Sequence, residues 1–358
     1  MKLNTAKKLT AGALALSMMF AMAVPMAFAT GSEVVPSTDH PHITKKYTAT
    51  NDGTSSPAET FTFTAVATKV EDAGVKADGS VITKDDAPKL TIHDAEYGAK
   101  GAMIDGAPMN LEIAKDKAFP NVGIYYYTVT ETPSGNAGVK THEGAMLLKV
   151  FVVYDDAGTA LQEKYVFYNG VDSTGKIVGD KGAAIENTYS AGSLAVTKKV
   201  TGNLGDKKKK FNVTVTFTAP AGKTVAGDIS YVEGGATKTI KPSDWEHGSV
   251  TKKIAVAHDD IVTFTNIPYG VTYTVVEDDY KTSDGYDKAE YEAEDIDTAN
   301  GTLATIDTAK ETVTITNNKG NGDVDTGVIL DNAPYILMLA VVAGGAMTLV
   351  IKKRREEE

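Results

Sequence analysis

Short stretches in which apolar and polar residues alternate recur along the chain. Typical examples lie at residues 61–65, 147–153, 211–217 and 271–276, and clusters of Gly, Pro, Asn and Asp separate them. Successive side chains of a β-strand point to opposite faces, so this alternation predicts strands with one buried face. Apolar patterns of helical period are missing between the two ends of the chain. The sequence therefore predicts an all-β protein built from sandwiches of short strands.

The strand pattern occurs twice in the same order. Each copy contains a strand with Thr-Lys-Lys, then a Phe-x-Asn segment that leads into a strand ending in Glu, and finally a strand that carries Asn. The matched segments are residues 43–46 and 196–199, residues 119–131 and 264–277, and residues 185–189 and 313–317. This repeat predicts two homologous domains, at residues 30–190 and 191–320.

Three polar residues of each copy lie on the strand face that should be buried. They are Lys45, Glu131 and Asn187 in the first copy, and Lys198, Glu277 and Asn317 in the second. A buried ammonium or carboxylate group is destabilising by several kcal/mol, so these groups must pair, neutralise or react. Desolvation lowers the pKa of a lysine and raises that of a glutamate, which favours a neutral, nucleophilic amine. With the carboxyl group as proton shuttle, such an amine can attack the Asn carboxamide, release ammonia and leave a Lys-Asn amide.

Two other interpretations stay open from the residues alone. A single inward lysine near the end of a strand commonly extends its ammonium group to water, although six coordinated cases argue against this reading. The lysines also occur as doublets. A β-bulge would shift the register by one residue, and Lys46 or Lys199 would then take the place of Lys45 or Lys198.

Both ends of the chain carry targeting patterns. Residues 1–29 combine an early lysine cluster, an apolar run and a small-residue site, which predicts a secretory signal peptide cleaved after Ala29; a retained membrane anchor is the alternative. Residues 335–351 are uncharged and apolar and are followed at once by a basic cluster, which predicts a membrane-spanning segment with a cytoplasmic end. Residues 321–358 are therefore assigned to a C-terminal tail, with Thr326-Gly327 just ahead of the apolar segment.

Composition excludes several classes of function. With 36 Lys+Arg against 47 Asp+Glu the formal net charge is −11, so we expect no nucleic-acid partner. The chain has no cysteine, which excludes disulfides and thiolate chemistry. The histidines are scattered and no serine lies in a nucleophile-elbow pattern. We therefore expect no metal, no cofactor and no enzymatic turnover.

The basic run at residues 207–210 is expected in a hairpin between the first two strands of the second domain.

The repeated Lys, Glu and Asn strands, placed between a signal peptide and a Thr-Gly tail, resemble the streptococcal-type major backbone pilins of Gram-positive bacteria. The resemblance implies two tandem immunoglobulin-like (CnaB-type) domains, each with a self-formed Lys-Asn isopeptide bond catalysed by glutamate. The implied sets are Lys45 with Asn187 and Glu131, and Lys198 with Asn317 and Glu277. It also implies that a sortase cuts between Thr326 and Gly327. Asp323 and Val324 stand where this sorting signal usually has Leu and Pro, so the responsible sortase stays open.

The same resemblance implies a covalent polymer. The acyl group of Thr326 would pass to a lysine of the next subunit, with Lys181 as first candidate and Lys176 as second, although both can equally be plain surface lysines. Implied partners are a pilin-type sortase, other copies of the chain, minor pilins and peptidoglycan, with a host surface ligand as a further candidate. The expected place is the cell wall, in the shaft of a fimbrium. The alternatives are a singly anchored adhesin or minor pilin that binds a host ligand, and an ordinary single-pass membrane protein.

Overall fold

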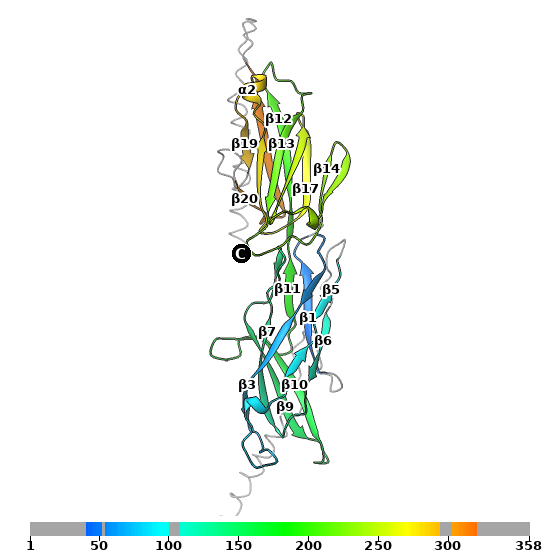
Figure 1. Cartoon of the computed structure of the whole chain (residues 1–358), viewed down its shortest axis with the longest axis vertical. Helices are drawn as coiled ribbons and strands as arrows, with labels where there is room; N and C mark the ends of the chain where they lie inside the picture. Colours follow the sequence, from blue (N-terminus) through cyan, green and yellow to red (C-terminus); the bar gives the residue numbers. More distant parts are fainter. Residues whose placement is uncertain (1–40, 52–53, 100–107, 294–302, 321–358) are drawn as a thin grey trace, which may run out of the picture.

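The computed structural model describes residues 41–51, 54–99, 108–293 and 303–320. Two halves are stacked end to end along the long axis of the molecule (Figure 1). Each half consists of two β-sheets that face each other across a hydrophobic core. The described residues include no helix that is long and apolar enough to cross a membrane.

The first half contains a five-stranded sheet with the strand order β4-β6-β1-β11-β8 and a four-stranded sheet with the order β10-β9-β7-β3. A small pair, β2-β5, lies beside them. The bounds of these strands are β1 (His42–Ala49), β2 (Glu59–Phe61), β3 (Phe63–Glu71), β4 (Leu90–Ile92), β5 (Ala95–Tyr97), β6 (Met109–Lys115), β7 (Gly123–Glu131), β8 (Val139–Lys140), β9 (Ala145–Tyr154), β10 (Leu161–Val171) and β11 (Ile185–Tyr189). A 3-10 turn at Lys84–Asp86 precedes β4.

The second half repeats this design, with a six-stranded sheet in the order β15-β14-β17-β12-β21-β19 and a four-stranded sheet in the order β16-β13-β18-β20. The bounds of its strands are β12 (Ala191–Thr201), β13 (Phe211–Thr218), β14 (Ile229–Glu233), β15 (Ala236–Ile240), β16 (Ser249–Val256), β17 (Ile261–Pro268), β18 (Thr272–Glu277), β19 (Glu290–Ala293), β20 (Ala304–Thr305) and β21 (Lys310–Asn318). A 3-10 turn at Pro242–Asp244 and a short helix, α2 (Tyr280–Asp284), complete this half.

In both halves the first and last strands are parallel neighbours in the larger sheet. β1 pairs with β11, and β12 pairs with β21. In each half the chain passes through all the remaining strands before its last strand pairs with its first. A single parallel ladder therefore joins the first and last strands of each half.

Alternation of side chains along the strands builds the two cores. In β7 every second residue from Gly123 to Glu131 is buried, so Tyr125, Tyr127 and Val129 pack inward while their neighbours are more exposed. β13 has the same alternation from Phe211 to Phe217. Each sheet thus presents an apolar face to its partner sheet, as the sequence pattern predicts.

The two halves meet in a hydrogen-bonded junction around Ser190, the single residue between β11 and β12. The main-chain N–H of Ser190 donates to Gly138 O at 2.9 Å, and its carbonyl oxygen accepts from the N–H of Tyr269 at 3.0 Å. Gly138 has φ +78°, and a Cβ there would lie 2.6 Å from Ser190 O, so this position requires glycine. Ala137 of the first half packs into the core of the second half.

The predicted fold class of two tandem all-β sandwiches is confirmed. Two local expectations are wrong. Residues 61–65 form no single strand, because β2 ends at Phe61 and β3 begins at Phe63. The basic run 207–210 closes no hairpin, because β12 and β13 belong to different sheets and the segment connects one sheet to the other. The predicted signal peptide, membrane-spanning tail and sorting signal lie outside the described residues.

Candidate functional site: two buried lysine, glutamate and asparagine triads

The first half brings Lys45, Glu131 and Asn187 together inside its core. Lys45 Nζ lies 3.0 Å from Glu131 Oε1, and both side chains are fully buried. Asn187 Nδ2 donates to the same oxygen, Glu131 Oε1, at 2.6 Å. One carboxylate oxygen therefore contacts both the amine and the carboxamide nitrogen.

The second half brings Lys198, Glu277 and Asn317 together in the same way. Lys198 Nζ lies 3.0 Å from Glu277 Oε1. Asn317 Nδ2 donates to Glu277 Oε2 at 2.6 Å, so here the carboxylate uses a different oxygen for each partner. Lys198 Nζ also donates to the carbonyl oxygen of Ile315 at 3.4 Å.

The register of the parallel strands explains why the triads form. In the first half Asn187 is paired with Tyr47, which lies two residues after Lys45 on the same face of β1. In the second half Asn317 is paired with Val200, two residues after Lys198 on β12. The glutamate comes in each case from the last residue of a strand in the opposite sheet, β7 or β18. Each triad therefore connects the first strand, the last strand and the facing sheet.

Burial shifts the pKa values of both lysines and of Glu277. Desolvation lowers the pKa of Lys45 from 10.5 to about 8, and the attraction of Glu131 only partly opposes this effect. The pKa of Lys198 is lowered for the same reason. Desolvation raises the pKa of Glu277, against the opposing charge of Lys198. Each shift favours a neutral amine, and in the second half a protonated carboxyl group beside it.

Aromatic rings cover both lysines. Lys45 Nζ lies 4.7 Å from the centre of the Phe61 ring and 5.9 Å from that of Phe63. Lys198 Nζ lies 4.4 Å from the centre of the Phe211 ring. The rings enclose the amine and supply a cation–π contact when it is charged. Sequence reasoning missed this role, although Phe61 and Phe211 begin the segments that follow the lysine strand in the two copies.

The second lysine of each doublet lies on the outer face of its strand. Lys46 Nζ is 3.8 Å from Glu186 Oε1; the Lys46 side chain is partly exposed and that of Glu186 is largely exposed. Lys199 is exposed and contacts Asp259. The structure therefore places Lys45 and Lys198, and neither Lys46 nor Lys199, beside the buried Glu and Asn residues.

Asn187 has one further partner that the sequence does not reveal. The main-chain N–H of His142 donates to Asn187 Oδ1 at 2.8 Å. The same N–H lies 3.2 Å from Glu131 Oε2. A main-chain donor carries no side-chain signature, so no residue pattern could have found it.

The two candidate acceptor lysines, Lys176 and Lys181, are exposed. Both belong to the segment between β10 and β11, and Lys181 forms a β-bridge with Tyr168 of β10. Thr326 and Gly327 lie outside the described residues. The structure thus shows one accessible segment of the first half that carries both lysines.

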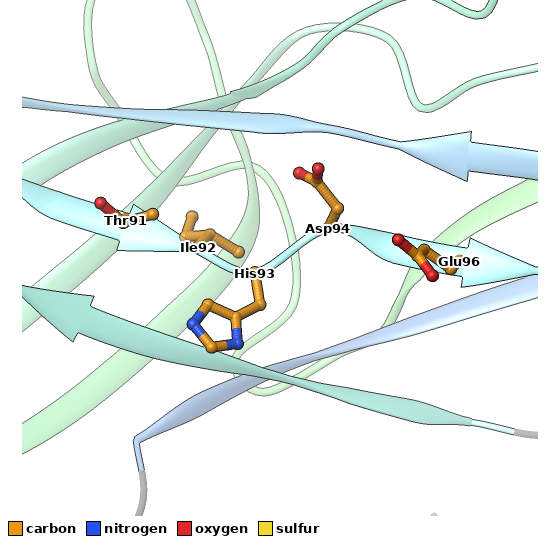
Figure 2. A pocket seen from close by; sticks show the side chains of 5 residues that line it. All are labelled: Thr91, Ile92, His93, Asp94 and Glu96. Carbon is orange, nitrogen blue, oxygen red and sulfur yellow. The ribbon is translucent and has the colours of Figure 1, made fainter.

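A surface depression elsewhere in the first half is lined by Thr91, Ile92, His93, Asp94 and Glu96 (Figure 2). The side chains of His93 and Asp94 point to opposite sides of the backbone, so its polar groups do not converge. Among the described residues, no group of three or more His, Asp or Glu side chains is arranged to hold a metal ion. Neither triad contributes to this depression.

In sequence, the chain is similar to a streptococcal pilin. Residues 192–319 match a family described as domain of unknown function DUF7601. A Streptococcus pyogenes serotype M1 pilin is 29% identical over 326 residues, which cover 87% of this chain and 90% of that protein. Two solved structures of Streptococcus pyogenes major pilins share 23% and 21% identity, with TM-scores of 0.49 and 0.47. Each match covers 78% of this chain, and 98% and 96% of the respective pilin. The chain is homologous to the Streptococcus pyogenes pilin.

Proposed function

We propose that the protein is the structural subunit of a covalently polymerised, cell-wall-anchored pilus shaft, and that each sandwich is locked by a self-formed Lys-Asn isopeptide bond. The observation that carries the proposal is the recurrence of one buried triad, with the same two-residue offset, at the parallel first and last strands of both halves. Homology to a pilin supports the same conclusion.

The condensation needs only the residues of the triad. A proton moves from the lysine ammonium to the glutamate, and the neutral Nζ attacks Asn Cγ to form a carbon–nitrogen bond. The glutamic acid gives this proton to Nδ2, and its carboxylate then takes a second proton from the attacking Nζ as the Cγ–Nδ2 bond breaks and ammonia leaves. The ammonia recovers that second proton from the glutamic acid, so lysine ammonium plus asparagine becomes a secondary amide plus ammonium, with the glutamate unchanged. This happens once per triad, so the protein is no turnover enzyme.

The surroundings favour this reaction over hydrolysis. Both lysine side chains are fully buried, so water is excluded from the nucleophile. The glutamate carboxylate contacts the amine and the carboxamide at the same time and holds them side by side. Such preorganisation contributes roughly 7–11 kcal/mol to the barrier reduction in well-oriented systems.

Polymerisation is proposed to occur between Thr326 and a lysine of the next subunit. A pilin-type sortase would cut Thr326-Gly327, hold the threonyl acyl group and pass it to Lys181 or Lys176. The exposure of both lysines supports this assignment, because an acceptor must enter the active site of a sortase. The last subunit would be transferred to peptidoglycan, and minor pilins would complete the fibre.

The primary test is the intact mass of recombinant residues 30–326, combined with peptide mapping. We expect a loss of about 34 Da, two ammonia molecules, and crosslinked peptides that join Lys45 to Asn187 and Lys198 to Asn317. Lys45→Ala should restore about 17 Da, whereas its outward neighbour provides the matched control: Lys46→Ala should keep both bonds. If the unaltered chain has the full mass calculated from its sequence, without loss of ammonia, the isopeptide assignment is overturned.

A second test separates a polymer from a singly anchored adhesin. Cell-wall extracts should contain high-mass ladders of this chain, and replacing both Lys181 and Lys176 by alanine should abolish them. Ladders that survive both substitutions would exclude these acceptors. Complete absence of ladders from cells that express the unaltered chain would favour the adhesin.

A further inference from the structure

The two triads differ in how the asparagine carbonyl is held. In the first half Asn187 Nδ2 donates to Glu131, while Asn187 Oδ1 accepts the main-chain N–H of His142 at 2.8 Å. A main-chain N–H can only donate, so this contact also fixes which end of the carboxamide faces the carboxylate. The electrophilic carbonyl therefore accepts a hydrogen bond from a main-chain donor.

The donor is positioned by the edge strand beside β11. β8 pairs with the last two residues of β11 through Lys140↔Thr188 and Val139↔Tyr189. The chain then continues past β8, and two residues after Lys140 the N–H of His142 meets the side chain of Asn187. The donor belongs to the main chain of the short segment between β8 and β9 rather than to a mobile side chain.

The second half has a different neighbour at the corresponding place. β19 pairs with β21 there, through Tyr291↔Ile315 and Glu290↔Thr316. The hydroxyl group of Tyr291 accepts the main-chain N–H of Glu277 at 2.8 Å, so this edge strand supports the glutamate. Asn317 Oδ1 is buried and has no hydrogen-bond partner within the residues that the structure describes.

We infer that the main-chain N–H of His142 acts as an oxyanion donor for condensation in the first half, a role that none of the described residues fills in the second half. This inference rests on the proposed function. When Lys45 Nζ bonds to Asn187 Cγ, the carbonyl electron pair moves onto Oδ1, and the N–H at 2.8 Å stabilises that negative charge. Glu131 passes a proton from the attacking Nζ to Nδ2, and breaking of the Cγ–Nδ2 bond then restores the carbonyl and releases ammonia. Removal of one such donor slows acyl-transfer reactions by roughly 10²–10³-fold.

The test compares His142→Pro, which lacks the N–H, with His142→Ala, which keeps it. Residues 30–326 are synthesised in a cell-free system, aliquots are quenched in acid, and peptide mapping follows each crosslink with time. We expect the Lys45-Asn187 bond to form roughly 10²–10³-fold more slowly in His142→Pro than in His142→Ala. The Lys198-Asn317 bond in the same molecules is the internal reference and should form at an unchanged rate.

A second substitution covers the case in which proline distorts the segment between β8 and β9. Incorporation of the α-hydroxy analogue of phenylalanine at position 142 replaces the N–H by an ester oxygen, and His142→Phe is its matched control. The ester should reproduce the slow bond formation without a shift in its pH dependence. Equal rates for the ester and the amide would overturn the inference. A shifted pH profile would also overturn it, because it would show that the N–H acts on the carboxyl group of Glu131 rather than on Asn187 Oδ1. If neither bond forms in the unaltered chain, the proposed function fails instead.

Discussion

Replacing Glu131 with glutamine is expected to remove the crosslink of the first half while preserving the shape of its core. Glutamine occupies nearly the same volume and can still hydrogen-bond to Asn187, but it cannot take the proton of Lys45. Burial lowers the pKa of Lys45 to about 8 even with Glu131 beside it, so without this partner the uncrosslinked lysine becomes neutral in the core, which adds its own cost. The missing covalent bond therefore sets the smallest loss of stability to expect.

Its magnitude follows from the loop that the bond would close. The loop from Lys45 to Asn187 spans 143 residues (187−45+1). Applying the chain-entropy relation for crosslinks to a loop of this length gives a stabilisation of about 5 kcal/mol at 25 °C. For a domain of about 150 residues each kcal/mol corresponds to roughly 2–4 °C, so Glu131→Gln should lower the Tm of the first half by about 10–20 °C.

Differential scanning calorimetry combined with intact mass measures both consequences in one sample. The mass should rise by about 17 Da relative to the crosslinked chain, beyond the small change from the substitution itself. Glu186→Gln is the control, because Glu186 lies next to Asn187 on the exposed face of β11, where removing its ion pair should change stability by at most about 1 kcal/mol. A variant that lacks the bond but keeps its Tm within about 2 °C of the unaltered chain would refute the reasoning.

Three further outcomes are expected. The rate of Lys45-Asn187 bond formation should fall as the pH rises above about 8, because the reactive pair must hold one shared proton; a rise through pH 8 would show that the free amine suffices. In Asn187→Ala, urea titrations should show the free energy of unfolding rising by about 3 kcal/mol between about pH 8 and pH 10.5. In this range Lys45 binds a proton in the unfolded chain but has released it in the folded chain. Adding Lys45→Met should remove this rise. Glu59→Ala should destabilise the junction by about 2–3 kcal/mol in calorimetry, since buried Glu59 accepts hydrogen bonds from Ser134 and Asn136, whereas exposed Glu96→Ala should be neutral.

Strand alternation predicts which polar residues face each core. A period of two places Lys45 on the same face as Ile43 and Tyr47, and burial of that face carries the lysine inward. The order of the Lys, Glu and Asn strands then predicts their meeting, provided that first and last strands are neighbours. The pairing of β1 with β11 fulfils this condition.

The rest of the site depends on features that lack a sequence signature. The N–H of His142 is available at any residue type, and only the pairing of β8 with β11 brings it to Asn187. Phe61 lies over Lys45 at the end of β2, which pairs with β5 and is separated from β3 by Thr62. The alternating sequence runs through Thr62 without interruption and gives no sign of this division. Tertiary pairing, rather than local pattern, decides both contacts.

The position of the proposed bonds follows from the same strand pairing that makes them possible. Tension that enters the second half at Ala191 and leaves after Asn318 pulls two parallel neighbours past each other. A bond between Lys198 and Asn317 would carry that force directly, and the 118 residues between them (317−198−1) would stay outside its path. A cysteine pair at this place would need an oxidant, whereas the amide needs only a dry core, a carboxyl group and the two strands that tension would otherwise separate. The buried face of the ladder between the first and last strands is therefore the place where the proposed bond can form and also the place where it would resist tension.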